Sequence, residues 1–231
     1  MYFPLFSGRI VIMSETEYYR SQTYQEYLLS SHRREVCPPE DVYAFFNWKG
    51  LTNLVDFGSG LGFYFQDFRK WFPHVWIWAA ECQQEIIDRI LRRKLMEGIE
   101  QLTPFYMDQS DHPLLPEWVP VPEIIFASLS LSTFPNPGLA MDGLIRSMKA
   151  GGRLFIIDWS KTESGFGPKI NEKISMDKMK FLAEEYKLEV TKSGRISEHF
   201  YALEVRASSN FIYGYYDLKE EEDEDTAVFK M

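Results

Sequence analysis

The stretch Val55-Asp56-Phe57-Gly58-Ser59-Gly60-Leu61-Gly62 decides the fold that this 231-residue sequence predicts. Its three glycines follow a short apolar run, residues 51–56, and precede a helical pattern over residues 64–72. Because glycine has no Cβ, such a loop lets the backbone pass close to a ligand. A strand, a glycine loop and a helix in this order are typical of open α/β sheets, which bind ligands beyond the carboxyl ends of their strands.

Apolar runs and helical patterns alternate on both sides of the glycine loop. Gly98 is suited to end one helix, and Ser175 to cap another that runs through Glu185. The expected strands are 51–56, 75–80, 102–107, 123–127, 153–158, 188–192 and 200–207, and the expected helices are 39–48, 64–72, 84–97, 139–148 and 175–185. The alternation predicts parallel strands joined by right-handed crossovers. The fold class is therefore α/β: a Rossmann-like, doubly wound, mostly parallel seven-stranded sheet with helices on both faces and an antiparallel last strand.

We expect one folded domain with two appendages. Residues 48–208 form the Rossmann-like domain. Residues 1–47 form an N-terminal extension with one or two helices over 14–36, suited to act as a lid, and the first dozen residues are expected to be weakly held. Residues 209–231 form an acidic tail that contains the run EEEDED at 220–225, and such a run is normally solvated.

Charge, cysteines and hydropathy restrict the functions open to the chain. The net charge of −9 disfavours a nucleic-acid substrate, since proteins that bind a phosphate backbone usually present a basic face. Cys37 and Cys82 form no CxxC pair and have no metal-ligand spacing with the four histidines, so we expect no metal and a reducing, cytoplasmic setting. No stretch approaches about 18 consecutive apolar residues, so no membrane span is expected.

Two ligand classes compete for the glycine loop. A dinucleotide loop reads GxGxxG and places a pyrophosphate at the N-terminus of the following helix. Here Phe63 stands at the third dinucleotide glycine, and Asp56 precedes the first glycine by two residues. The Asp56 carboxylate would repel a pyrophosphate but attract the cationic amino group of a methionine moiety. The loop therefore favours S-adenosylmethionine over a nicotinamide dinucleotide.

Further polar side chains end the second and third predicted strands. Glu81 can accept both ribose hydroxyls of a nucleoside, or it can be an exposed acid that opens a helix. Asp108 could reach an adenine amino group, or it could be an ordinary turn residue. Gln109 is an equal candidate for the adenine contact. Cys82 could pack on the adenine or be a half-buried thiol.

Several of these segments resemble class I, UbiE/type-11-like methyltransferases. The stretch VDFGSGLGFYFQDF at 55–68 is similar to their first motif, and AMDGLIRSMKAGGRLFIIDW at 140–159 is similar to their helix, Gly-Gly turn and fifth strand. Glu81 and Asp108 match the acids that end their second and third strands. HRREVCPPEDVYAFFNWKG at 32–50 resembles their approach helix, so the resemblance covers roughly residues 32–207.

The resemblance implies methyl transfer from S-adenosyl-L-methionine, with S-adenosyl-L-homocysteine as the product. By position, Asp56 and Gly58 would hold the methionine end, and Gly60 would admit the cofactor. Glu81 would hold the ribose. The candidate cofactor-binding residues are Asp56, Gly58, Ser59, Gly60, Gly62, Glu81, Cys82, Asp108, Gln109 and Ser128.

No motif identifies the methyl acceptor. Residues 127–130 lack the Asn/Asp-Pro-Pro-Tyr signature of amino methylation on nucleic acids, which leaves a small-molecule acceptor as the expectation. Its pocket is expected between the N-terminal helices and the loops 128–138 and 159–173. Candidate bases are His199, His112, Asp158 and Tyr106, and none of them is chosen. Aromatic residues that could line the pocket are Tyr18, Tyr19, Tyr24, Trp48, Phe134, Trp159 and Phe166.

Other function classes remain open at the level of sequence. The chain could be a non-catalytic module that binds S-adenosylmethionine or S-adenosylhomocysteine, or a scaffold. A nicotinamide-dependent oxidoreductase is disfavoured by the loop chemistry, and a protein or RNA methyltransferase is disfavoured by the acidity. The oligomeric state is open, with a homodimer among the options.

Overall fold

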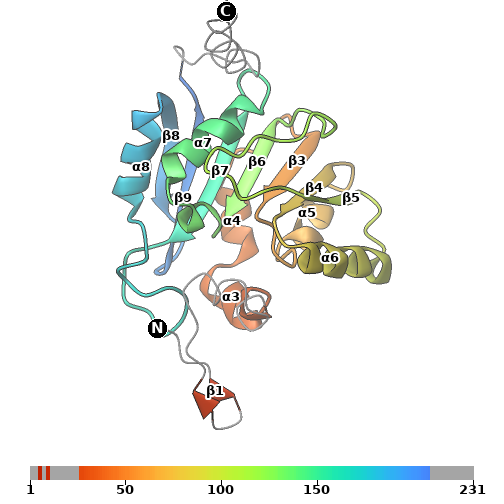
Figure 1. Ribbon diagram of the computed structural model, residues 1–231, viewed down its shortest axis with the longest axis horizontal. Helices are drawn as coiled ribbons and strands as arrows, with labels where there is room; N and C mark the ends of the chain where they lie inside the picture. Colours follow the sequence, from red (N-terminus) through yellow and green to blue (C-terminus); the bar gives the residue numbers. More distant parts are fainter. Residues whose placement is uncertain (1–4, 7–8, 11–25, 209–231) are drawn as a thin grey trace, which may run out of the picture.

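A mixed seven-stranded sheet forms the centre of the fold in this computed structural model, which describes residues 5–6, 9–10 and 26–208 (Figure 1). The strand order is β5-β4-β3-β6-β7-β9-β8. Strands β3 to β7 pair in parallel, whereas β9 runs antiparallel to both of its neighbours. The strands are β3 (Asn53–Phe57), β4 (Trp76–Glu81), β5 (Leu102–Tyr106), β6 (Ile124–Ser128), β7 (Arg153–Trp159), β8 (Leu188–Arg195) and β9 (Phe200–Ala207). The predicted fold class is confirmed.

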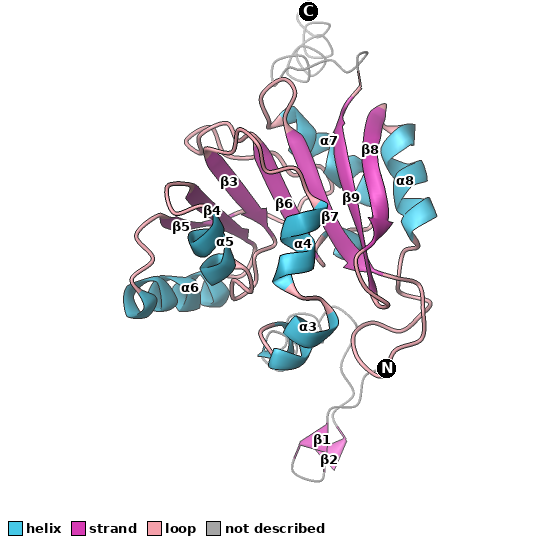
Figure 2. Cartoon of the chain, turned by 180° about the vertical axis from the view of Figure 1, so that it is seen from behind, coloured by secondary structure: helices cyan, strands magenta, loops and turns pink. Residues whose placement is uncertain are grey.

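Helices cover both faces of this sheet (Figures 1 and 2). Buried side chains of α4, α5 and α6 pack against one face, and those of α7 and α8 pack against the other. The short helix α3 lies beyond the carboxyl ends of the parallel strands (Figure 2). The helices are α3 (Ser31–Val36), α4 (Pro39–Phe45), α5 (Phe65–Trp71), α6 (Gln84–Glu97), α7 (Pro137–Arg146) and α8 (Met176–Glu185), with a 3₁₀ turn η1 (Leu131–Thr133).

Local sequence signals fix most helix ends. Gly98 ends α6 in the left-handed region at φ 62°, which a residue without a Cβ adopts at little cost. The Ser175 side chain accepts a hydrogen bond from the Lys178 amide at 3.2 Å and caps α8, as predicted. The helix predicted over 139–148 instead runs from Pro137 to Arg146. It starts earlier because Asn136 caps it and proline fits its first turn.

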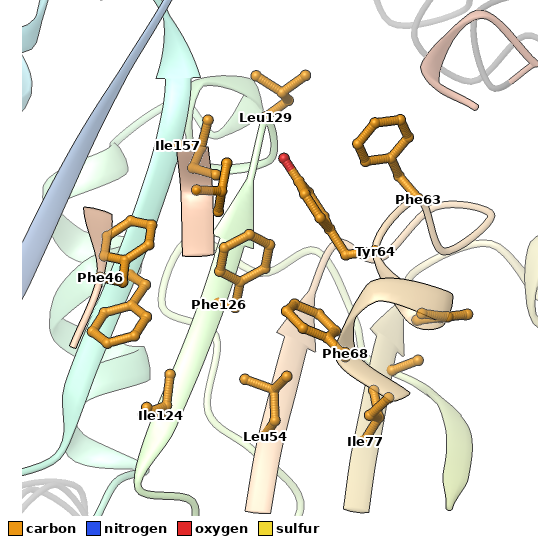
Figure 3. Packing of buried hydrophobic residues seen from close by; sticks show 14 of the residues in the cluster. Phe46, Leu54, Phe63, Tyr64, Phe68, Ile77, Ile124, Phe126, Leu129 and Ile157 are labelled. Atoms are coloured by element: carbon orange, nitrogen blue, oxygen red, sulfur yellow. The ribbon is translucent and has the colours of Figure 1, made fainter. Parts of the chain in front are cut away.

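The face covered by α4 and α5 is unusually aromatic. The ring of Phe46 stacks on that of Phe155, with centroids 4.3 Å apart and an interplanar angle of 8°. Phe126 contacts Phe68 edge to face at 5.3 Å, and both are fully buried. Tyr64 stands beside them with its hydroxyl directed towards Leu129, near the edge of the sheet that carries the site (Figure 3). This packing fixes the start of α5, and with it the glycine loop that precedes α5.

One crossover lacks a helix among the described residues. Between β5 and β6 the chain runs without regular structure, as its four prolines predict. Leu115 and Val119 from this stretch are buried in the same core as α7. His112 anchors it through a hydrogen bond of 2.8 Å between its Nε2 and Asp142 of α7.

Parts of the predicted appendages lie outside the described residues. These are residues 14–25 of the expected N-terminal helices, with Tyr18, Tyr19 and Tyr24, and the acidic tail 209–231. Two short strands, β1 (Leu5–Phe6) and β2 (Arg9–Ile10), pair antiparallel. No helix in the described part of the chain is long and apolar enough to cross a membrane.

Candidate functional site

A cavity of about 490 Å³ lies beyond the carboxyl ends of the parallel strands. The glycine loop in the sequence predicted a ligand site at this edge of the sheet. The last residues of four strands line it, from β3 to β7: Phe57, Glu81, Ser128 and Trp159. The cavity therefore spans the point where the strand order reverses, between β3 and β6, where open α/β sheets bind their ligands.

Gly58 and Gly60 form the cavity wall on the side of β3. Both have positive φ angles, 67° and 52°. The amides of Gly58 and Ser59 donate to the Ala80 carbonyl at 3.0 and 3.1 Å, which ties the loop to β4. A Cβ on Gly58 would lie 2.5 Å from the Cβ of Ser130, so no larger residue fits between the loop and Ser130, which follows β6. The glycine thus lets the loop pack directly against Ser130.

Ser59 and Gly62, two other predicted cofactor residues, are not among the residues that line the cavity. Ser59 is buried. Gly62 has φ 78°, and a Cβ there would lie 2.0 Å from the ring of Phe65. Its carbonyl and that of Leu61 accept hydrogen bonds from Arg93 of α6, at 2.7 Å for Leu61. The second half of the loop is therefore shaped by packing.

Glu81 is almost fully buried and holds the rim of the cavity together. Its Oε2 accepts from the Gly60 amide at 3.0 Å, and its Oε1 accepts from the amides of Cys82 at 2.8 Å and Gln83 at 3.2 Å. Burial raises the pKa of Glu81, and these hydrogen bonds oppose the rise. The carboxylate lies where prediction placed it, at the end of β4 and facing the cavity.

Asp56 is the second buried carboxylate near the glycine loop, and it lies directly behind the cavity wall. Burial raises its pKa to about 7, the charge of Arg33 opposes this, and the charge of Glu81 adds to it. No hydrogen bond from a described residue contributes to that pKa. A carboxylate in this state lacks the partners that normally satisfy a buried charge.

Arg33 is a buried cation beside the cavity that sequence reasoning missed. It is 5% exposed, and its guanidinium carbon lies 4.0 Å from the centre of the Phe63 ring. It donates to the Leu28 carbonyl at 3.0 Å and to the Ser128 hydroxyl at 2.9 Å, and both acceptors belong to cavity-lining residues. Neither contact is to a carboxylate. No signal in the sequence separates it from its neighbour Arg34.

The remaining predicted cofactor residues lie together on the cavity wall: Cys82, Asp108, Gln109 and Ser128. Asp108 and Gln109 are exposed at its mouth, after β5. The Cys82 thiol is half-buried and donates to Glu81 at 3.4 Å. The Ser128 hydroxyl accepts the hydrogen bond from Arg33.

None of the four candidate bases lines the cavity. His112 is bonded to Asp142 on the face of the sheet covered by α7, and Tyr106 is 53% exposed on edge strand β5. Asp158 is 1% exposed and accepts from the Ser132 hydroxyl at 2.9 Å and the Trp159 amide at 2.7 Å. Burial raises its pKa to about 6.

The fourth candidate, His199, belongs to an aromatic cluster beside the cavity. Its ring meets Phe166 edge to face at 4.8 Å, and Phe166 also contacts Trp159 at 5.8 Å. Trp48, another predicted pocket residue, is instead buried between Phe155 and the helices on that face. Of the expected pocket aromatics within residues 26–208, Trp159 and Phe134 line the cavity.

The end of the cavity away from the glycine loop has a mixed character. Trp159, Phe134 and Leu129 provide apolar surface. Asn171, Glu172 and Lys173, from the loop after β7, provide polar groups that sequence reasoning missed. This loop was predicted to form part of an acceptor pocket, but its composition alone does not indicate which of its side chains turn inwards.

The chain is similar in fold to solved methyltransferase structures. A S-adenosylmethionine-dependent methyltransferase from Aquifex aeolicus matches with a TM-score of 0.72 and 21% identity over 80% of this chain and 97% of that one. The O-methyltransferase NcsB1 from neocarzinostatin biosynthesis, solved with S-adenosyl-L-homocysteine and 1,4-dihydroxy-2-naphthoic acid, matches at 0.67 and 17%. That match covers 84% of this chain and 62% of NcsB1.

A third similar structure is a type 11 methyltransferase from Sulfolobus solfataricus, described in its name as putative. It has a TM-score of 0.58 and 17% identity over 78% of this chain and 98% of that one. No protein-family model matches the sequence, and no curated protein sequence matches it. At these identities the similarity establishes the fold: a Rossmann-like fold of the class I methyltransferase type.

Proposed function

We propose that this protein is a S-adenosylmethionine-dependent methyltransferase that acts on a small-molecule acceptor. The observation that carries the proposal is the pair of opposite charges behind the glycine loop. Asp56 is a buried carboxylate without a hydrogen bond from a described residue, and Arg33 is a buried guanidinium in its electrostatic range. The methionine end of the cofactor is a zwitterion, so its ammonium would offset Asp56 and its carboxylate would offset Arg33.

The other polar groups of the cavity suit the nucleoside part of the same cofactor. Glu81 would accept hydrogen bonds from the ribose hydroxyls, and Asp108 or Gln109 would meet the adenine amino group. A dinucleotide suits these residues poorly. Its pyrophosphate would lie at the glycine loop near Asp56, and the Asp56 carboxylate would repel it.

When bound, the cofactor supplies an electrophilic methyl group on a sulfonium. The contribution of the chain is to orient the acceptor and to exclude water, which are the main requirements of such a displacement. Leu129, Phe134 and Trp159 would form a dry wall for the acceptor. A small-molecule acceptor also agrees with the net charge of −9 and with the naphthoic acid bound by NcsB1. Both cysteines are free thiols, which supports a reducing, cytoplasmic setting.

Calorimetry with three cofactors tests the proposal. We expect the wild-type protein to bind S-adenosylmethionine and S-adenosylhomocysteine and not NAD. Glu81→Gln is expected to weaken binding by about tenfold or more, because a neutral amide with one acceptor oxygen replaces the charged carboxylate that would bind the ribose hydroxyls. Glu85→Gln, which changes an exposed acid on α6, is the matched control and should bind like wild type. Binding of NAD in preference, or of none of the three, would refute the proposal.

A further inference from the structure

Lys173 is a buried cation at the end of the cavity away from the glycine loop. Within residues 26–208, Lys173 and Arg33 are the cationic side chains that the fold buries, and Lys173 is 3% exposed. It lies in the loop between β7 and α8 and lines the cavity together with Trp159. A buried charge is costly unless it is paired, so its partner is informative.

The contacts of the ammonium within the described chain are neutral. Nζ donates to the Thr162 carbonyl and to the Ser164 hydroxyl, both at 2.8 Å, and lies 5.5 Å from the centre of the Trp159 ring. No carboxylate of a described residue forms an ion pair with it; Glu163 acts on it only at longer range. An ammonium has three donors, and these two hydrogen bonds occupy two of them. Burial lowers the pKa of Lys173 because a buried ammonium is poorly solvated, and a bound anion would stabilise its charged form.

We propose that Lys173 binds an anionic group of the methyl acceptor, and that the acceptor is a flat, mostly apolar molecule that carries a carboxylate. That this ligand is the methyl acceptor rests on the proposed function, whereas the anion site rests on the surroundings of Lys173. Trp159, Phe134 and Leu129 supply the apolar wall against which such a molecule lies. Glu172 also lines this end, and one of its oxygens accepts from the Lys169 amide at 3.0 Å. Its charge orients the acceptor, because the carboxylate must point to Lys173 and away from Glu172.

A purely structural role for Lys173 leads to a different expectation. The side chain does connect Thr162 to Ser164 and so stabilises the loop. A substitution of Lys173 would remove these loop contacts. A lysine that only stabilised the loop would not make the protein prefer a charged ligand over a neutral one of the same shape. Selectivity between two such ligands therefore separates anion recognition from loop stabilisation.

The experiment compares 2-naphthoate with 2-naphthamide, which has nearly the same shape and no charge. Binding is measured by calorimetry and by quenching of tryptophan fluorescence, with and without saturating S-adenosylhomocysteine. A charge-assisted hydrogen bond in a buried site predicts that the wild type prefers the carboxylate by about tenfold or more. Lys173→Met should abolish the preference, and Lys173→Arg should keep most of it. Lys161→Met removes an exposed charge from the same loop and should leave the preference unchanged.

Equal affinity for the two probes, including no measurable binding of either, would overturn the proposal. A preference that survives in Lys173→Met would also overturn it. Binding of S-adenosylhomocysteine by Lys173→Met at wild-type affinity shows that the variant is folded. If the cofactor does not bind the wild type at all, the proposed methyltransferase function fails, while the probe comparison without cofactor still decides whether Lys173 selects an anion.

Discussion

The buried charge of Asp56 should make the free protein less stable than its Asp56→Asn variant, by an amount that depends on pH. The folded pKa of Asp56 is about 7, against an ordinary value of 3.8. Because the folded state holds the proton more tightly, the free energy of unfolding falls as the pH rises from about 4 to about 7. The difference between these two pKa values corresponds to a loss of about 4 kcal/mol of stability at high pH.

Asparagine has nearly the volume of aspartate and carries no charge. The stability advantage of Asp56→Asn should therefore grow by about 2 kcal/mol between about pH 5.5 and about pH 8.5. Urea unfolding of both proteins across this range measures the difference. Asp111→Asn removes an exposed carboxylate and controls for net charge. A difference between Asp56→Asn and wild type that stays constant with pH would refute the assigned burial and charge state of Asp56.

The same variant should lose affinity for S-adenosylmethionine. If the ionised carboxylate binds the cofactor ammonium, wild-type affinity rises as the pH rises towards about 7, where Asp56 releases its proton. Asp56→Asn should bind at least about tenfold more weakly at neutral pH and lose that dependence. Undiminished cofactor affinity in a variant of greater stability would mean that Asp56 does not contact the methionine end.

Two further predictions follow from the loop and from α3. Arg33→Met should weaken S-adenosylmethionine binding by about tenfold in calorimetry. Arg34→Met removes a partly exposed ion pair and should leave the binding unchanged. Equal effects of the two variants would mean that Arg33 has no role in cofactor binding. Gly62→Ala should lower the free energy of unfolding by several kcal/mol more than Gly50→Ala, since both have φ 78° but only the first would clash with Phe65. Similar melting temperatures for these two variants would contradict the packing of the loop.

Much of the fold follows from signals that lie close together in the sequence. Helix α6 spans the predicted residues because Gly98 ends it. The apolar run before the glycine loop forms the buried strand β3. Gly58, Gly60 and Glu81 line the cavity as expected, since parallel strands bring their carboxyl ends to one edge.

Only the tertiary structure shows which member of a pair of similar residues is buried at or beside the cavity. Arg33 turns inwards to Ser128, 95 residues away, whereas Arg34 beside it pairs with Asp67 at 2.8 Å. Lys173 is buried against Trp159, and the sequence around it contains no periodic pattern that would indicate this. By itself, the sequence determined the sheet, the glycine loop and the acids at the strand ends, because these depend on local periodicity and turn chemistry. Burial of individual charges depends on contacts between distant segments, so the burial of Lys173 in the cavity wall and of Arg33 beside the cavity could be seen only in the folded chain.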